Sequence, residues 1–498
     1  MRMHRMAWLA AFTTLCGCNL APNYQPPHFI LPADYQGSAA FSVATPQDAL
    51  ARGPWWLMFG DPELDRLEQQ AVTGNPDLAA AAEAYTQSRD LAAEAEAGMF
   101  PRLGAQASVS ENKQSFNRLF RNNPYSRNIE SSNELEGSVS WEPDLWGEIR
   151  NRARAQRQLA QASAAEFAAA QLSLQSQLAN EYFALRGLDA ELVVYRQAAN
   201  LYTTAVEITR LRLAGSISSG LDVARAENQL AATEALATDV AANRAVLQHA
   251  IADLVGVSAS SFVLPPQSQS PLVLPEVPVS VPAALLQRRP DIAEAERRMA
   301  AANTSIGVAR AAFYPNGVIS AFTGFQDNGF ALASLPNSLW SVGGALMLPL
   351  IEGGLRRAEL QRSWSIYAQT RDGYRSTVLS AFQEVEDALT LTQQLKLESA
   401  QETQAVNAAT TAQALSMRLY TDGLSDYLDV VVAQETALTA EIAETGVRTR
   451  QMQAAVQLIL ALGGGWNTAQ LPSAGEVMPF SPYDKSALPG GKVGRSQD

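Results

Sequence analysis

The chain has 498 residues and a formal net charge of −13 at pH 7, with 47% hydrophobic and 17% charged residues. An acid excess of this size disfavours nucleic acid and anionic lipid as partners, because their phosphate groups repel it. The only cysteines, Cys16 and Cys18, lie too close together to staple the fold with a disulfide. Beyond the N-terminus no run of about 18 apolar residues occurs, which excludes a membrane-spanning helix there.

The N-terminus has the layout of an export signal. Arg2 and Arg5 precede an apolar run, residues 6–15, that is too short to span a bilayer. A leucine and two small residues then lead to Cys18, which resembles the processing site of bacterial lipoproteins and predicts an acylated cysteine. Asn19, in place of an aspartate, resembles a signal for sorting to the outer membrane. The alternative is a chance cysteine within an ordinary signal peptide.

The rest of the chain is an internal duplication. Residues 75–101 align without a gap with residues 289–315, including a Pro-Asp pair near the start and an aromatic residue followed by proline at the end. Residues 212–223 also match residues 418–430, which are one residue longer. A period of about 210 residues is too long for a solenoid unit. We therefore expect two halves with the same structure.

Each half contains a long segment without proline. None of the 25 prolines lies between Pro143 and Pro265 or between Pro349 and Pro472. Because proline costs about 3 kcal/mol inside a helix, such gaps are typical of long helices. A helix over residues 147–213 would be about 100 Å long, which is too long for one compact globule.

An apolar stripe at helical spacing supports the first long helix. It consists of Leu174, Leu178, Tyr182, Leu185, Leu188, Leu192, Tyr195, Ala199, Tyr202 and Val206. A turn rich in Gly and Ser at residues 215–220 predicts a return helix over residues 221–255. In the second half we expect a long helix to residue 420, a turn around Gly423 and a return helix over residues 428–462.

Short strands precede each long helix. Residues 133–143 alternate between apolar and polar side chains, which predicts a strand with one apolar face. The acids on its other face are Glu134, Glu136 and Glu142. Further strands are expected over residues 103–112, 318–326 and 339–350, the last with Trp340, Val342, Gly344, Leu346 and Leu348 on one side. Each is about ten residues long, the length that crosses a bilayer when tilted.

Four strands cannot close a barrel on their own. Bacterial transmembrane barrels have at least about eight strands, and open edges are costly in lipid. If the strands lie in a membrane, several copies must pool them, and the sequence does not set the number of copies. The alternative is the edge of a soluble β-sandwich.

These patterns predict the following domain organisation: a signal peptide, 1–17; a lipid-anchored extended segment, 18–60; a first repeat of a helix, two strands and a long helical hairpin, 61–256; a Pro-rich connector, 257–288; a second repeat, 289–465; and a C-terminal tail, 466–498. Trp55 and Trp56 are interpreted as packing anchors.

The lipoprotein-type signal, the duplicated halves, the Pro-Asp motifs and the paired Leu-Asp-Val turns together resemble the TolC-like outer-membrane efflux channels, in their lipoprotein (NodT-type) branch. The resemblance covers roughly residues 18–470. It implies that residues 19–60, residues 257–290 and the region after 463 form a belt around the middle of the helical barrel. It implies a mainly α-helical fold and a homotrimer. In that trimer the long antiparallel hairpins form an α-barrel, and the four strands of each protomer form a twelve-stranded β-barrel. The three acids of the strands would then line the lumen and favour cationic substrates.

The resemblance also implies the function. It predicts a passive conduit in the Gram-negative outer membrane that exports drugs and small molecules. The implied partners are a periplasmic adaptor protein, an inner-membrane pump of the RND type and outer-membrane lipid through acylated Cys18. A type I protein-secretion channel and a lipid-anchored envelope coiled coil without a pore are the alternatives. No catalytic, metal or cofactor motif occurs, so neither an enzyme nor a cofactor is expected.

The resemblance places a closing aperture at the two turns between long helices. Asp222 and Tyr420 match residues that tie neighbouring hairpins in the family, and Asp429 matches an aspartate that lines the pore. Val432 and Ser425 depart from the pattern, since family members often have an acid and an arginine at these positions.

Three nearby residues complete the expected aperture. Arg418 could replace the missing arginine, and Asp422 and Asp426 add negative charge. The alternative role for Asp222 and Asp429 is to cap the N-terminus of a return helix.

Overall fold

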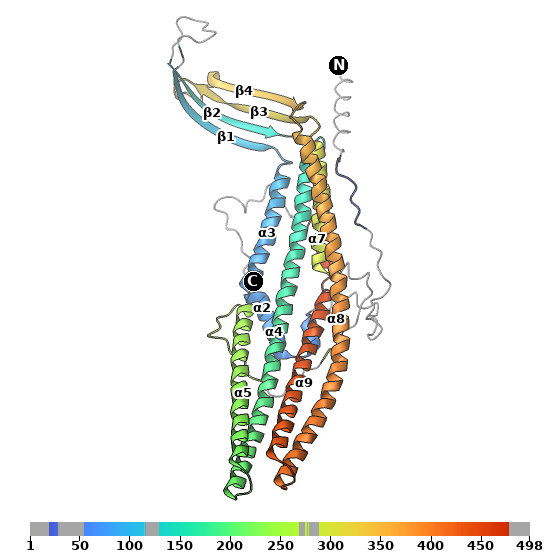
Figure 1. The fold of residues 1–498 in the computed structure, drawn as a ribbon. Helices are drawn as coiled ribbons and strands as arrows, with labels where there is room; N and C mark the ends of the chain where they lie inside the picture. Colours follow the sequence, from blue (N-terminus) through green and yellow to red (C-terminus); the bar gives the residue numbers. More distant parts are fainter. Residues whose placement is uncertain are drawn as a thin grey trace.

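The computed structural model describes residues 19–27, 54–113, 115, 129–267, 274–275, 277 and 288–477. Its elements follow in this order: η3 (Trp55–Phe59), α2 (Pro62–Gly74), α3 (Pro76–Ala97), β1 (Arg102–Lys113), β2 (Ile129–Trp141), α4 (Glu148–Ala214), α5 (Gly220–Val255), α7 (Pro290–Ala311), β3 (Asn316–Asp327), η4 (Leu335–Asn337), β4 (Ser338–Met347), α8 (Leu355–Thr421), α9 (Tyr427–Ala461) and η5 (Thr468–Gln470). Among these residues, none of the helices is long and apolar enough to span a bilayer. Figure 1 shows the strands at one end of the helices and the helix turns at the other.

The predicted duplication is confirmed element by element. The long helices α4 and α8 have 67 residues each, α3 and α7 have 22 each, and the return helices α5 and α9 have 36 and 35. Each long helix begins after a glycine with a positive φ, Gly147 at 76° and Gly354 at 92°, a backbone that favours glycine. At 1.5 Å per residue, each long helix measures about 100 Å.

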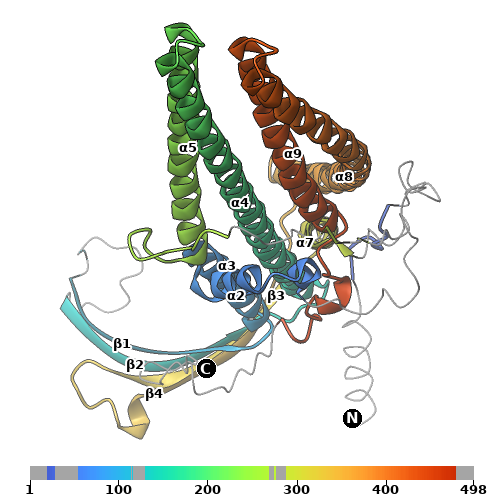
Figure 2. The same cartoon turned by 90° about the horizontal axis from the view of Figure 1, so that it is seen from below.

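The four helices of the two hairpins lie side by side in the order α5, α4, α9, α8 (Figure 2). The central helix α4 contacts α3, α5, α7 and α9. This position explains the predicted apolar stripe of α4, none of whose members is exposed. The helices α5 and α8 form the two ends of the row.

The four strands form one antiparallel sheet in the order β1-β2-β3-β4. The register places Leu135 between Ala107 and Phe325, so the apolar side chains of neighbouring strands share a face. Glu134 and Glu136 lie on the opposite face. Large apolar residues remain exposed on the first face, and these include Leu103, Trp340, Val342 and Leu346.

Two predicted strand ends are wrong. Strand β2 ends at Trp141, and β4 ends at Met347, in each case two residues before a proline. A proline cannot donate a hydrogen bond to the sheet, which limits how far a strand continues. Glu142 and Leu348 therefore lie beyond the sheet, and Glu142 does not share the strand face of the other two acids.

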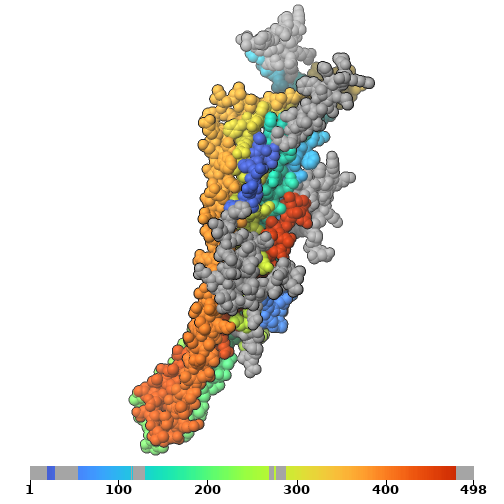
Figure 3. Space-filling model, turned by 90° about the vertical axis from the view of Figure 1, so that its right-hand side faces the viewer, coloured from blue at the N-terminus to red at the C-terminus, as the bar shows by residue number. Residues whose placement is uncertain are grey.

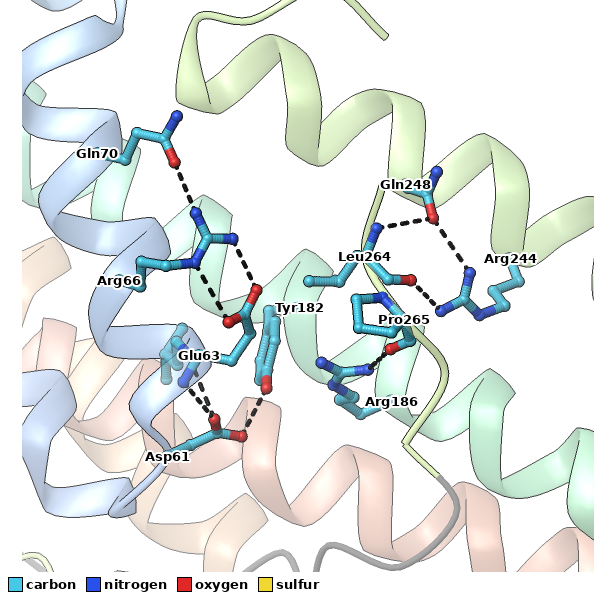
Figure 4. A network of polar contacts seen from close by, with 11 residues as sticks. Asp61, Glu63, Arg66, Gln70, Tyr182, Arg186, Arg244, Gln248, Leu264 and Pro265 are labelled. Atoms are coloured by element: carbon cyan, nitrogen blue, oxygen red, sulfur yellow. Dashed lines mark hydrogen bonds and ion pairs between the residues drawn. The ribbon is translucent and has the colours of Figure 1, made fainter. Parts of the chain in front are cut away.

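A large apolar core lies at the middle of the helices. It combines η3 and α2 with α4, α5, α7, α8 and α9. Trp55 and Trp56 are buried in it, as predicted. Their rings pack edge to face, with the ring centroids 5.9 Å apart. Asp61 caps α2 by accepting hydrogen bonds from the backbone of Glu63 and Leu64 at 2.9 and 3.3 Å (Figure 4).

Hydrogen bonds hold the start of the predicted connector against the first hairpin (Figure 4). Arg186 of α4 donates to the carbonyl of Pro265 at 3.0 Å, and Arg244 of α5 donates to the carbonyl of Leu264 at 2.8 Å. The buried carboxylate of Asp189 forms ion pairs with both arginines. Each cation therefore has a counter-charge, without which its burial would be costly.

The first described segment, residues 19–27, lies along α7 (Figure 3). Arg310 Nη1 donates to the carbonyl of Leu20 at 3.1 Å, and Asn303 Nδ2 donates to the carbonyl of Pro22 at 2.8 Å. We expected this segment to belong to the belt. It lies instead along α7, with Leu20 beside Arg310 near the end that leads into β3 and Tyr24 beside Glu296.

The contact between this segment and α7 is close. A Cβ atom added to Gly307 would lie 2.7 Å from the nitrogen and 2.8 Å from the Cα of Ala21, so only glycine fits there. The Tyr24 hydroxyl donates to the carboxylate of Glu296. Cys18 itself lies outside the described residues, so its predicted acylation stays a prediction.

Candidate functional site

The candidate site consists of the two helix turns at the end of the molecule opposite the sheet (Figures 1 and 2). Residues 215–219 join α4 to α5, and residues 422–426 join α8 to α9. Gly423 adopts a φ of 77°, so the second turn uses the freedom of glycine. We call these two turns and the last helical turns beside them the tip.

A small apolar cluster joins the two hairpins at the tip. Tyr420 of α8 and Tyr427 of α9 pack edge to face with ring centroids 5.1 Å apart. Both rings are buried, together with Val206 of α4 and Val430 of α9. Just above them, the Tyr202 hydroxyl of α4 donates to the carbonyl of Gln434 at 3.2 Å.

Two tyrosines at the tip, Tyr427 and Tyr202, stay neutral at physiological pH. Burial is the main reason why the pKa of Tyr427 rises to about 12, with a smaller effect of the nearby Asp222 charge. Burial likewise raises the pKa of Tyr202 to about 12. The hydroxyls of Tyr427 and Tyr202 therefore do not ionise below about pH 10.

Arg212, on the last turn of α4, ties the first hairpin to the second. Its Nη1 donates to the carbonyls of Tyr420 and Thr421 at 3.0 and 3.1 Å. Its guanidinium carbon also lies 4.6 Å from the centroid of the Tyr420 ring. These are the last carbonyls of α8, where the negative end of the helix dipole favours a cation.

The structure brings only some of the predicted aperture residues together. Tyr420 lies at the centre of the cluster, and Asp222 is close enough to Tyr427 for its charge to raise the pKa of that residue. The Tyr420 hydroxyl has no hydrogen-bond partner among the described residues, so the predicted tie through this group does not form within one chain.

The remaining predicted residues are exposed at the tip: Arg418, Asp422, Asp426 and Asp429. Their contribution to an aperture stays a prediction. Among the described residues the tip carries three exposed carboxylates on the second turn and the start of α9, which gives it a negative surface.

The alternative capping role for Asp222 and Asp429 is wrong. Ser219 and Asp426 occupy the N-cap positions of α5 and α9, and neither makes a side-chain capping bond. Asp222 and Asp429 are each the third residue of their helix. Their charges still suit the positive end of the helix dipole, but they leave the first backbone N–H groups unpaired.

Sequence reasoning missed Arg212, Tyr427 and Tyr202 as tip residues. The repeat contained the signal for the first, because Arg212 aligns with Arg418 when residues 212–223 are matched to residues 418–430. Tyr202 belonged to the predicted apolar stripe, yet the stripe did not reveal which helix it faces.

The acids of the sheet have distinct surroundings. Glu134 Oε1 accepts a hydrogen bond from Gln326 Nε2 of β3 at 2.7 Å and another from the Ser132 hydroxyl at 3.2 Å. Glu136 lies on the same face two residues later. Whether these residues and Glu142 line a lumen stays a prediction. In the described part of the chain, no three acidic, His or Cys side chains are placed to hold a metal ion.

Comparison with known proteins places this geometry in a family. The family model described as "Outer membrane efflux protein" matches residues 67–257 and 281–464. The chain is 29% identical over 477 residues to the pyoverdine export outer membrane protein OpmQ of Pseudomonas aeruginosa, covering 94% of this chain and 98% of OpmQ. It is 29% identical over 457 residues to the toluene efflux pump outer membrane protein TtgC of Pseudomonas putida, covering 91% and 93%.

A solved structure agrees with these relatives. The outer membrane protein VceC of Vibrio cholerae is 29% identical, with a TM-score of 0.76 over 82% of this chain and 98% of VceC. The duplicated helical hairpins and the four-stranded sheet are thus shared with outer-membrane channels. With a family model that spans most of both repeats, this chain belongs to the outer membrane efflux protein family.

Proposed function

We propose that this protein is the outer-membrane channel subunit of a tripartite efflux system. In this role it is a passive conduit that receives drugs or other small molecules from an inner-membrane pump through a periplasmic adaptor. Membership of the outer membrane efflux protein family supports the location and the efflux role. The pump is of the RND type, as the resemblance of the sequence implies.

One observation carries the proposal that several copies build the channel: repeat-equivalent positions differ in exposure. Tyr202, Ala205 and Val206 of α4 are buried, in or beside a cluster that includes α9. Their equivalents on α8 are exposed, and these are Ala408, Thr411 and Ala412. Since the backbone is the same in both repeats, α8 lacks the neighbour that α4 has.

Equivalent residues of the two return helices also differ in exposure, and here the second repeat has the buried ones. Tyr427 and Gln434 of α9 are buried, whereas their equivalents on α5, Gly220 and Glu227, are exposed. On α4 this face is covered by the return helix α9, so the exposed face of α8 lacks a return helix beside it. The return helix whose matching face is exposed is α5. A second copy of the chain satisfies both faces at once.

A contact of α8 on one copy with α5 on the next is head to tail, and such contacts generate rings when they close. The sheet can also join copies head to tail, because β1 and β4 are its two edge strands. Pairing β4 with β1 of the next copy removes edges that would be costly in lipid. We propose three copies, the number that the family resemblance implies.

In such a ring the two faces of the sheet have different surroundings. The exposed apolar face, with Leu103, Trp340 and Leu346, suits lipid. The opposite face, with Glu134 and Glu136, lines the lumen. At the tip, the exposed carboxylates around a narrow bore repel one another and attract cations.

The N-terminal segment supports a lipid anchor at Cys18. Arg310, near the end of α7 and six residues before β3 begins at Asn316, donates a hydrogen bond to the carbonyl of Leu20. Cys18 lies two residues further, within about 7 Å of chain reach. Acyl chains on Cys18 would therefore enter the membrane beside the strands. Replacing Cys18 by serine should abolish labelling with radioactive palmitate, and unchanged labelling would contradict the anchor.

Conductance in planar bilayers tests the channel. Purified protein should carry current and favour cations, and Glu134→Gln with Glu136→Gln should reduce that preference. An absence of current would favour the envelope spacer, and equal conductance for anions and cations would contradict the acidic lumen. Deletion of the gene should increase sensitivity to dyes, detergents and antibiotics. A defect confined to protein export would favour the type I secretion channel instead.

The substrate is left at the level of small molecules. The names of the relatives refer to pyoverdine, toluene and cations, which differ widely in chemistry. A conduit that accepts such different molecules does not need a specific pocket. Testing the deletion strain against a panel of compounds would identify the substrate class.

A further inference from the structure

A pocket lies where the helices of the first repeat meet the sheet (Figure 1). The end of α3 and the beginning of α4 form its helical wall, and the adjoining ends of β1, β2 and β3 complete it. Its volume of about 510 Å³ is within the range of pockets that bind small organic molecules. The pocket is therefore large enough for a ligand of that size.

The pocket faces the same side as the acids of the sheet. Arg102 lines it and is paired with Ser140, which follows Glu134 and Glu136 at even spacing on β2. Because side chains alternate along a strand, all four lie on one face of the sheet. Val318, another lining residue, lies on this face two residues before the β3 partner of Ser140. In the proposed ring the pocket thus opens toward the lumen.

Five charged side chains line the pocket, and these are Glu94, Arg102, Glu142, Glu148 and Arg152. Arg152 Nη2 and Glu148 Oε1 form an ion pair at 2.7 Å. The side chains of the other three make no hydrogen bond or ion pair with the described residues. Two carboxylates and one guanidinium are therefore available to a ligand, which leaves an excess of negative charge.

The second repeat has no charge at any of the equivalent positions. Matching the first residues of β1 and β3, and the last residues of β2 and β4, identifies these positions. They hold, in the same order, Val308, Asn316, Leu348, Gly354 and Ala358. The second repeat builds the same junction without these charges, so the fold does not require them. A role in binding explains why the first repeat has them.

Aromatic and apolar side chains complete the pocket. Phe100 and Trp141 are 41% and 38% exposed, and Leu91 and Ile149 lie on the helical wall. The face of an aromatic ring attracts a cation, as a carboxylate does. Burial raises the pKa of Glu148, which indicates a partly dehydrated surrounding in which charges attract one another more strongly.

We propose that this pocket binds amphiphilic organic cations, small molecules with an amine and an aromatic or apolar body, as they pass through the channel. Glu94 and Glu142 attract the amine, and the aromatic and apolar side chains contact the body. Arg102 offers a contact to molecules that also carry an acidic group. The inference rests on the proposed function and names a substrate class for it. Binding at this site is weak, because conduction requires the molecule to leave.

The first test measures binding of the fluorescent cation rhodamine 6G to the purified full-length protein by fluorescence anisotropy. Binding should be saturable, and Glu94→Gln with Glu142→Gln should weaken it several-fold. Neither change breaks an ion pair among the described residues, so the variant keeps the fold. Glu83→Gln with Asp90→Asn removes the same charge at exposed positions of α3 outside the pocket and should hardly change the affinity.

The second test locates the bound dye by protection of a cysteine. Saturating rhodamine 6G should slow the reaction of a maleimide with Ser140→Cys, because this residue lines the pocket. Ser341→Cys is the control, since it is exposed on the same sheet face but on β4, outside the pocket. Its reaction should have the same rate with and without the dye. Equal rates for Ser140→Cys in both conditions would place the dye elsewhere and overturn the inference.

The remaining outcomes separate the pocket from the channel. If the two double variants weaken dye binding equally, the dye follows the overall charge of the protein and the inference is wrong. A protein that conducts ions but does not bind the dye saturably would keep the proposed function and lose the pocket. A protein that binds the dye at Ser140 but carries no current would keep the pocket and lose the proposed function.

Discussion

Glu68 lies on α2 with a side chain that is fully buried, and neither carboxylate oxygen has a hydrogen-bond partner among the described residues. Burial, aided by the charge of Asp65, raises the pKa of Glu68 to about 9. The side chain is therefore neutral at pH 7 in the folded protein. In the unfolded chain it ionises near its usual pKa of about 4.3.

This difference makes Glu68 a pH-dependent cost to stability. Because its pKa is raised on folding, its contribution is neutral below about pH 4 and becomes more unfavourable as the pH rises toward 9. We expect Glu68→Gln to stabilise the protein on the order of 2 kcal/mol at pH 7.5, and hardly at all at pH 4.5.

Thermal unfolding followed by circular dichroism at both values measures this difference. Glu83→Gln, at an exposed site on α3, is the matched control and should change little at either pH. A gain for Glu68→Gln that is equal at the two pH values would contradict the predicted ionisation.

The tip shows how far single residues can be read from the sequence. Tyr420 and Asp429 could be placed at the tip because the glycine turn and the Leu-Asp-Val repeat mark it. The ring contact between Tyr420 and Tyr427 could not be predicted, since it depends on how α8 and α9 rotate about their axes. The buried state of Glu68 had no sequence signal either.

At the scale of elements, the equivalence of the repeats extends to the chain ends. Asn303 of α7 donates to the carbonyl of Pro22, and its repeat equivalent on α3, Arg89, donates to the carbonyl of Val477 at 2.9 Å. The segment after the predicted anchor and Val477 of the predicted C-terminal tail thus contact equivalent places on α7 and α3.

The contact of residues 19–27 with α7 leads to a specific prediction. Gly307→Ala places a methyl group against the backbone of Ala21, which cannot move aside as a side chain could. Hydrogen exchange of residues 19–24 should become faster in this variant. Gly373→Ala, with nothing within 4 Å of the new methyl group, is the control and should stabilise α8 by about 0.5–1 kcal/mol. Equal hydrogen exchange of residues 19–24 in the two variants would contradict this contact.

Most element boundaries followed from proline and glycine. The proline-free gaps and the glycine turns predicted both ends of α4, the end of α8 and both return helices to within one residue. The predicted strand ends were less accurate. The alternation of side chains in the sequence continues through Glu142 and Leu348, although the hydrogen-bonded pairing of the strands has already ended. The docking of residues 19–27 on α7 was missed because short extended segments carry no periodic signal.

At the scale of the whole molecule, the duplication explains why one copy is incomplete. Each repeat supplies one hairpin and two strands, and the contact between the two hairpins mainly uses one face of α4 and one face of α9. The equivalent faces on α8 and α5 are left for other copies. The four strands of one chain predicted that several copies must pool their strands. They could not set the number of copies, because that number depends on the angle between neighbouring copies.

Native mass spectrometry of the acylated protein in detergent measures directly how many copies form the channel. We expect a single species with three times the mass of the mature chain, which dissociates when the contact between α8 and α5 is disrupted by Ala412→Arg. A uniform single-copy species that still conducts ions would contradict it, because one chain would then have closed its own pore.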